Sequence, residues 1–126
     1  MTVLDASALL AYLHDEPGAE VVQEVLSGPA WIGAVNLAEV LTKLADAGQE
    51  PDQAITGVTI LGINVTPFDE DHAVQTARLR PLTVQAGLSL GDRACLALGR
   101  LLRQPVLTAD AAWRGLVPDL EVRVIR

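Results

Sequence analysis

The chain has 126 residues, enough for one domain with a buried core but too few for a second domain, so we expect a single domain over residues 1–126. Half of the residues are apolar, yet the longest uncharged stretch contains Gly57, Asn64 and Pro67 and lacks the roughly 20 continuous apolar residues of a membrane-spanning helix. A net charge of -7 argues against a protein that holds nucleic acid by bulk electrostatic attraction.

Hydrophobic periodicity divides the chain into alternating strands and helices. Apolar residues three and four positions apart mark the helices, and a glycine ends two of them, at Gly48 and Gly87. This alternation predicts an α/β sandwich with a mainly parallel central sheet. In chain order, the expected elements are a strand at residues 3–4, helices at 7–14 and 19–26, a strand at 30–35, a helix through 37–44, a helix from 51, a strand at 63–66, a helix at 69–86 with a break near Pro81, a helix at 89–102, a strand at 106–108, a short helix from 110 and a strand at 122–125.

Four acidic residues stand where apolar segments give way to helices, and they are Asp5, Glu39, Asp92 and Asp110. Three of the four follow a predicted strand, directly or after a short turn. Because parallel strands end at one edge of an open sheet, where ligands bind, we expect these acids to become neighbours. Crowded carboxylates repel one another, and Mg²⁺ or Mn²⁺ relieves that cost because hard cations prefer oxygen ligands. The pattern therefore predicts a divalent-metal site.

Each acid also has a purely structural interpretation. The N-x-x-E motif that ends at Glu39 and the S-x-x-D motif that ends at Asp92 both match the helix capping box. Asp5 and Asp110 could each be a simple N-cap residue. Capping alone does not require an acid at every strand-to-helix junction. The two interpretations are also compatible, since a helix N-terminus stabilises a carboxylate and keeps it ionised for a metal.

Four short motifs occur in an order that resembles a known family. They are D-A-S-A-L at residues 5–9, N-L-A-E-V at 36–40, S-L-G-D-R-A at 89–94 and L-T-A-D-A-A-W at 107–113. The set is similar to the PIN-domain nucleases, and specifically to the VapC-type toxins of bacterial toxin-antitoxin pairs, over residues 3–113. The resemblance implies a three-layer α/β/α sandwich, which agrees with the strand and helix pattern.

The resemblance also implies an activity, a cofactor and partners. The protein would be an endoribonuclease that cleaves RNA and pairs with a cognate antitoxin whose tail enters the acidic site. One or two Mg²⁺ or Mn²⁺ ions would be held by the four acids, Asp5, Glu39, Asp92 and Asp110. The supporting polar groups would be Ser7, Asn36 and Thr108.

Metal-assisted hydrolysis of phosphodiester bonds is the hypothesis for the chemistry, with Glu39 either binding the metal or orienting water. All nine basic residues lie from Lys43 onward, so phosphate contacts must come from the second half of the chain or from bound metal. Arg93 and Arg114, which follow Asp92 and Asp110 closely, are candidate phosphate contacts. An ion pair within the protein is the alternative interpretation for both arginines.

Two other functions fit parts of the sequence. An aspartyl-phosphate type of phosphohydrolase would use Asp5 as its nucleophile, although Ser7 stands where such enzymes usually carry a second aspartate. A catalytically silent PIN-like binding module would instead use the acidic site to capture a basic peptide. We expect His14 and His72 to be solvated, and Cys95 and Trp113 to be packing groups.

The remaining expectations concern location and assembly. No basic segment followed by an apolar core begins the chain, so we expect no secretory signal and a cytoplasmic protein. A lone cysteine agrees with a reducing compartment. The high apolar content leaves surface to be covered by another subunit, so we expect a homodimer.

Overall fold

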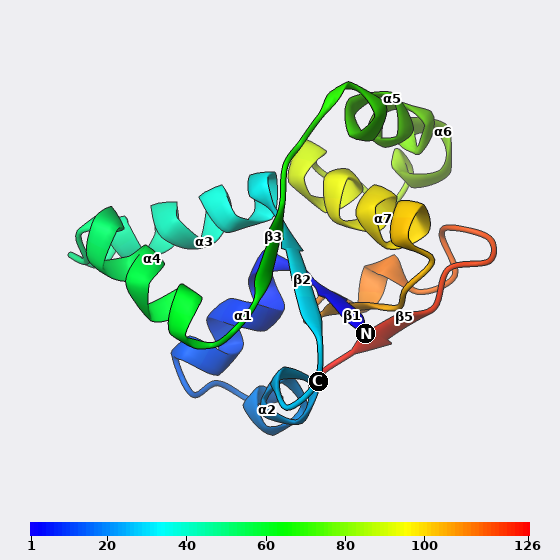
Figure 1. Ribbon diagram of the computed structural model, residues 1–126. Coiled ribbons are helices and arrows are strands. Elements are labelled where there is room, and N and C mark those ends of the chain that lie inside the picture. Colours follow the sequence, from blue (N-terminus) through cyan, green and yellow to red (C-terminus); the bar gives the residue numbers. More distant parts are fainter.

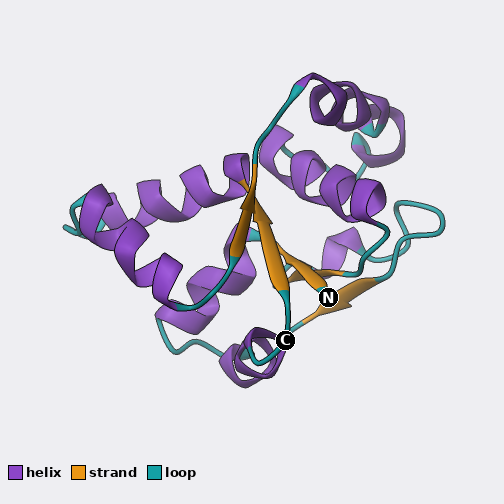
Figure 2. Cartoon of the chain, in the orientation of Figure 1, coloured by secondary structure: helices purple, strands orange, loops and turns teal.

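A five-stranded sheet lies between two layers of helices in the computed structural model, which describes residues 1–126 (Figure 1, Figure 2). The strand order is β3-β2-β1-β4-β5, and every neighbouring pair is parallel. The strands are β1 (Thr2–Leu4), β2 (Ala30–Gly33), β3 (Asn64–Thr66), β4 (Val106–Thr108) and β5 (Val122–Val124).

The helices connect these strands. Those of the first half are α1 (Ala6–Leu13), α2 (Ala19–Leu26), α3 (Ala34–Asp46) and α4 (Pro51–Ile60). Those of the second half are α5 (Glu70–Arg78), α6 (Arg80–Thr83), α7 (Leu90–Leu102) and the 3-10 helix η1 (Ala111–Trp113). None of these helices has the length and apolar character needed to cross a bilayer.

Successive strand residues point into two separate cores, one on each face of the sheet. Leu4, Ile32 and Leu107 pack with the buried residues of α1 to α4. Val3 and Val106 pack on the other face, against α7 and Trp113. Figure 1 shows α3 and α4 on one side of the strands and α5, α6 and α7 on the other. The predicted three-layer α/β/α sandwich is confirmed, and its sheet is parallel throughout.

One predicted strand end is wrong, and two predicted helical segments differ from the structure only in detail. Strand β2 ends at Gly33, because Ala34 and Val35 already form the first turn of α3. The break expected near Pro81 is confirmed, because α5 and α6 are separated at Leu79 and Pro81 lies in the first turn of α6; α6 ends at Thr83, earlier than expected. The short helix expected from Asp110 is present as the three-residue 3-10 helix η1, and Gly115, with φ of 71°, turns the chain away soon after it.

Strand order determines where the functional edge of the sheet lies. From the central strand β1, the chain moves outward to β2 and β3, and then crosses to the other side to form β4 and β5. The direction of winding therefore changes between β1 and β4. In open parallel sheets, ligands bind beside the carboxyl ends of the strands at such a switch point. Asp5 follows β1 directly, and Thr108 is the last residue of β4.

Close packing of α7 on β4 depends on Gly99. An ideal Cβ at Gly99 would lie 2.4 Å from Val106 Cγ2 and 3.2 Å from Gln104 O. Gly57 in α4 is a matched contrast, because a Cβ there would meet no atom within 4 Å.

We expect alanine to have opposite effects at these two helical glycines. Gly99→Ala should lower the free energy of unfolding by about 1 to 3 kcal/mol, because the added methyl group overpacks the contact with β4. Gly57→Ala should raise it by about 0.5 to 1 kcal/mol, because alanine loses less backbone entropy on folding. Urea denaturation of the three proteins measures both changes. Equal changes at the two positions would contradict the close approach at Gly99.

Candidate active site

Asp5 is a buried carboxylate at the switch point of the sheet, with 4% of its surface exposed. Its Oδ2 atom accepts hydrogen bonds from Ser7 Oγ at 2.5 Å and from Thr108 Oγ1 at 2.9 Å. Ser7 Oγ in turn accepts a hydrogen bond from the backbone N–H of Ala109 at 3.0 Å. Although Asp5 occupies the N-cap position of α1, its side chain makes no capping hydrogen bond. Capping therefore does not explain why this carboxylate is buried.

The pKa of Asp5 depends on its burial and on the charges of two other acids. The pKa of Asp5 is raised from 3.8 to about 6, and burial is the main cause. The hydrogen bonds from Ser7 and Thr108 have the opposite effect and lower this pKa. The negative charges of Asp92 and Glu39 make smaller contributions in the same direction as burial, and these are part of the rise to about 6. No basic side chain offsets them, since the two salt bridges in the structure join Arg123 to Glu121 and Arg126 to Glu16.

Glu39 is held by an amide that links two helices. Asn36 Nδ2 donates to Glu39 Oε1 at 2.8 Å and to the carbonyl oxygen of Gly91 at 2.9 Å. Both partners accept hydrogen bonds, so the nitrogen of the amide must face them. The capping box predicted at Asn36 and Glu39 is wrong, because α3 has Gly33 at its N-cap and Asn36 lies three positions inside the helix. Asn36 instead joins α3 to the first turn of α7.

Asp92 has the predicted capping role. Its Oδ2 atom accepts from the backbone N–H of Ser89 at 2.9 Å, and its own N–H donates to Ser89 Oγ at 3.2 Å. Both halves of the capping box are therefore present at the start of α7. The charge of Asp92 nevertheless acts on Asp5, so capping does not remove this acid from the group.

Asp110 lies at the margin of the group. Its side chain is exposed and caps η1, with Oδ1 accepting from the N–H of Ala112 at 2.9 Å. Its own N–H donates to Thr108 Oγ1 at 3.1 Å, which connects its backbone to the partners of Asp5. The charge of Asp110 is not among those that raise the pKa of Asp5. The structure thus brings together Asp5, Glu39 and Asp92, with Asp110 beside them.

The donor set fits a hard divalent cation in chemistry and in charge. All the donors are oxygen atoms, and both hydrogen bonds to Asp5 end on Oδ2, so that Oδ1 has no protein partner. As the side chains lie, no three His, Cys, Asp or Glu residues gather closely enough to hold an ion by themselves. Mg²⁺ in particular is usually held by one or two carboxylates and keeps several waters. Asp5 with Asp92 or Glu39 fits this mode of binding.

The two candidate phosphate contacts differ in their surroundings. Arg93 is half-buried, and its Nη1 donates to the carbonyl oxygen of Thr76 at 3.3 Å, while its Nε is buried without a partner. Arg114 is exposed. Neither forms a salt bridge, so the ion-pair interpretation is wrong for both.

His72 contradicts the expectation of a solvated side chain. It is 2% exposed, and its Nε2 lies 2.8 Å from the carbonyl oxygen of Ala94 in α7. A helical signal could have found it, because His72, Thr76 and Leu79 form one buried face at the spacing of a helix. Cys95 and Trp113 are fully buried, as expected.

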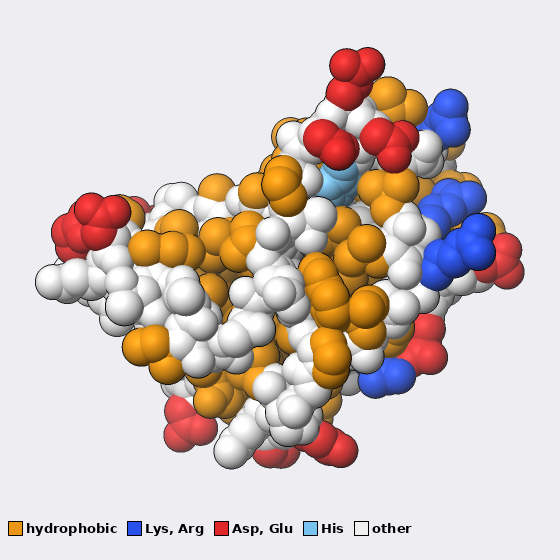
Figure 3. All heavy atoms as spheres, viewed as in Figure 1, with side chains coloured by type: hydrophobic (Ala, Val, Ile, Leu, Met, Phe, Trp, Pro, Cys, Tyr) orange, Lys and Arg blue, Asp and Glu red, His pale blue; other side chains and the backbone are white.

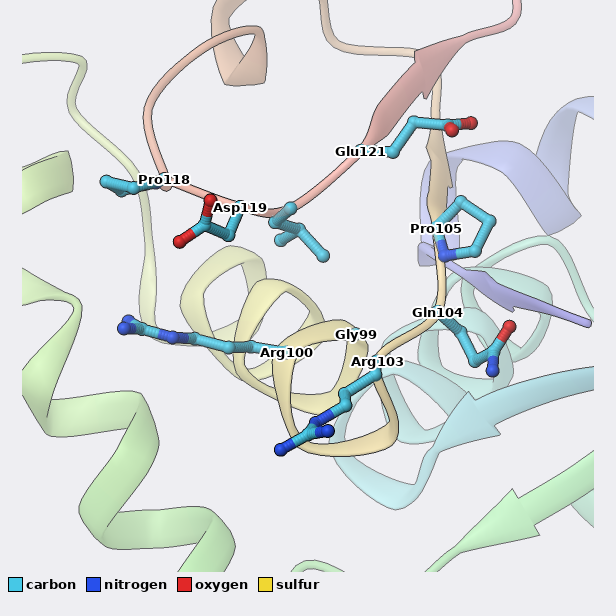
Figure 4. A pocket seen from close by; sticks show the side chains of 9 residues that line it. Gly99, Arg100, Arg103, Gln104, Pro105, Pro118, Asp119 and Glu121 are labelled. Atoms are coloured by element: carbon cyan, nitrogen blue, oxygen red, sulfur yellow. The ribbon is translucent and has the colours of Figure 1, made fainter.

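The cavities of the molecule lie away from the acids. The largest, about 430 Å³, is at the opposite edge of the sheet, between the last turn of α7 and the segments that enter β4 and β5 (Figure 4). Arg100 in α7 and Arg103, the residue that follows α7, extend in different directions there, with Asp119 on the facing loop. No cavity is lined by any of the four predicted acids. The acids therefore lie at an edge of the sheet and not inside a cavity.

We expect Asp5 to make the metal-free protein less stable as the pH rises. The folded state keeps the proton of Asp5 up to a pKa of about 6, whereas the unfolded chain releases it near 3.8. The free energy of unfolding should therefore fall by roughly 3 kcal/mol between about pH 4 and pH 6, and this contribution should stay constant above pH 6. Asp5→Asn should lack this fall and be more stable than the wild type at neutral pH. Urea denaturation across this range tests it, and parallel curves for the two proteins would contradict it.

Three comparisons place the chain among known proteins. Among curated proteins, none matches it. Solved structures with the same fold include a toxin-antitoxin complex from Klebsiella pneumoniae, with a TM-score of 0.78 at 20% identity, covering 100% of this chain and 98% of that one. FitAcB from Neisseria gonorrhoeae has a TM-score of 0.74 at 21% identity, covering 99% and 98% of the two chains. VapBC2 from Rickettsia felis, bound to a DNA fragment from its promoter, has a TM-score of 0.72 at 15% identity, covering 98% and 97%.

These similar structures show that the fold is shared. A match to the sequence pattern of one family also shows the family. The pattern of the PIN domain matches residues 2–116, nearly the whole chain. The chain therefore belongs to the PIN domain family.

Proposed function

We propose that this protein is a metal-dependent endoribonuclease and the toxin of a toxin-antitoxin pair. One observation carries the proposal: Asp5 is buried at the switch point of the sheet and interacts with two further acids, and no salt bridge neutralises any of the three. Such a group is costly to maintain without a cation. Membership of the PIN domain family supports a nuclease, and the likeness to chains from toxin-antitoxin complexes supports a toxin.

Each residue of the site has a separate task in this proposal. Asp5, Asp92 and Glu39 would hold one or two Mg²⁺ or Mn²⁺ ions, with Asp110 as the outermost acid of the set. When bound, the cation supplies a water of lowered pKa and neutralises charge on the phosphate. Ser7 and Thr108 fix the Oδ2 atom of Asp5 and leave Oδ1 available. Asn36 fixes the Glu39 carboxylate.

RNA contacts would come from the second half of the chain. Figure 3 shows Lys and Arg side chains gathered on the side of α5, α7 and β5, whereas the side of α3 and α4 shows none in this view. Arg93 is next to Asp92 in sequence and pairs with no acid. Its Nη1 donates to the carbonyl oxygen of Thr76 and its Nε is buried, so it would contact a phosphate only through the remaining part of the guanidinium. Arg114 is proposed as a second, weaker contact because it is exposed.

An antitoxin and a second copy of the chain are the proposed partners. An antitoxin is supported by the complexes in which similar chains occur. An apolar groove of about 350 Å³ between α1, α3 and α4 is available to such a partner, and Leu44 and Val58 are among its lining residues. A homodimer is supported by large apolar side chains on the surface, such as Ile60 at 79% and Leu90 at 57% exposed.

A silent binding module is the second candidate function, and specific observations favour it. Asp92 completes a capping box, Asp110 accepts a capping hydrogen bond from Ala112, and no three acids enclose a metal position. The phosphohydrolase alternative gains no comparable support, because Lys43, the only lysine, is exposed in the last turn of α3.

RNA cleavage separates the nuclease from the binding module. Purified, partner-free protein should cut a mixture of transfer and ribosomal RNA into discrete products with Mg²⁺ or Mn²⁺, and a chelator should abolish the cutting. Asp92→Asn should reduce the rate on the order of 10² to 10³-fold, because a carboxylate that holds the cation is lost. Asp119→Asn, at the opposite edge of the sheet, is the control and should cut like the wild type.

The negative outcomes of this assay are also informative. Cleavage that persists in chelator and in Asp92→Asn would overturn the proposed chemistry. Folded protein that neither cuts RNA nor binds Mn²⁺, yet binds a basic peptide, would establish the binding module instead.

A further inference from the structure

Gly91 lies against the Glu39 carboxylate with no room for a side chain between them. An ideal Cβ built on Gly91 would lie 2.5 Å from Glu39 Oε2 and 2.7 Å from both Cδ and Oε1. These distances are far shorter than van der Waals contact between carbon and oxygen. Any other residue at position 91 would therefore collide with the Glu39 carboxylate where it now lies.

The backbone conformation gives no other reason for glycine at this position. Gly91 is not one of the glycines with positive φ, and it lies in the first turn of α7. Alanine in a helix is more favourable than glycine by up to about 1 kcal/mol. What Gly91 provides is therefore the space over its Cα atom, and Glu39 occupies that space.

Gly91 also provides one of the atoms that hold Glu39. Its carbonyl oxygen accepts a hydrogen bond from Asn36 Nδ2, and the same nitrogen donates to Glu39 Oε1. The carboxylate is thus confined between the amide of Asn36 and the Cα of Gly91. Asp92, the next residue in α7, shares with Glu39 the electrostatic effect on Asp5.

We propose that Gly91 is a positioning residue, whose missing side chain sets where the Glu39 carboxylate lies relative to Asp92. This inference rests on the proposed metal-dependent function, because that position matters for holding the cation. The carboxylate is the far end of a flexible side chain, so a methyl group at position 91 can displace it without disturbing the fold. Gly91→Ala should therefore leave the protein folded and stable while weakening its affinity for the cation.

Calorimetric titration of the metal-free protein with Mn²⁺ tests this proposal through a double-mutant cycle. Gly91→Ala should weaken Mn²⁺ binding about tenfold or more, in the range found when supporting residues of metal sites are changed. Glu39→Gln alone should weaken binding to a similar degree. In the Gly91→Ala background, Glu39→Gln should add almost nothing, because Glu39 has already been displaced. Gly57→Ala, a glycine with open space around it, is the matched control and should bind like the wild type.

A second measurement does not depend on metal. The NMR signals of the Asn36 side-chain amide should shift in Gly91→Ala, because this amide loses Glu39 as a partner. Unchanged Asn36 signals, wild-type Mn²⁺ affinity in Gly91→Ala, or fully additive losses in the double variant would each overturn the proposal. Wild-type protein that binds no Mn²⁺ would defeat the metal function itself, and the Asn36 signals would still decide whether Gly91 positions Glu39.

Discussion

The pair of hydrogen bonds from Ser7 and Thr108 to Asp5 is the interaction on which the site depends. A carboxylate buried without partners would cost several kcal/mol and would lose its charge. The two hydroxyls oppose that loss, and they come from elements on both sides of the switch point, since Ser7 is in α1 and Thr108 ends β4. The parallel strand order makes the contact between residues 5 and 108 available. The same hydrogen bonds orient Asp5 with one oxygen free.

Glu39 and Asp92 are each held by a local hydrogen bond. The site is therefore ordered although no basic side chain pairs with its acids. Asn36 orients Glu39, and Ser89 orients Asp92. Each contact satisfies one carboxylate, but none offsets the repulsion among the three charges. Burial is the main cause of the raised pKa of Asp5, and the charges of Asp92 and Glu39 add a smaller contribution in the same direction. A group of acids that is well ordered but electrostatically unfavourable is typical of functional sites. Such sites lower the folding stability of the protein and serve binding or catalysis.

Sequence patterns located the parts of the site that depend on strand ends and helix caps. Asp5 follows from the rule that parallel strands end at one edge, and the Ser89 and Asp92 capping box follows from its spacing. Thr108 was expected only from the family resemblance. Asn36 was misassigned because Ala34 and Val35 are apolar and suit a strand, although they begin α3. The burial of His72 and the space at Gly91 depend on how α5 and α3 pack on α7, and local propensity carries no such information. A glycine inside a predicted helix was the available signal for Gly91.

In the proposed function, the three acids at the switch point together hold a divalent cation. Crystals of the partner-free protein grown with Mn²⁺ test it most directly, since the anomalous scattering of manganese locates the ion independently of any assumed ligand. We expect one or two strong peaks beside the Oδ1 atom of Asp5, within coordination distance of Asp92 or Glu39. Saturating Mn²⁺ with no peak near Asp5, or with peaks only at other surface acids, would contradict it.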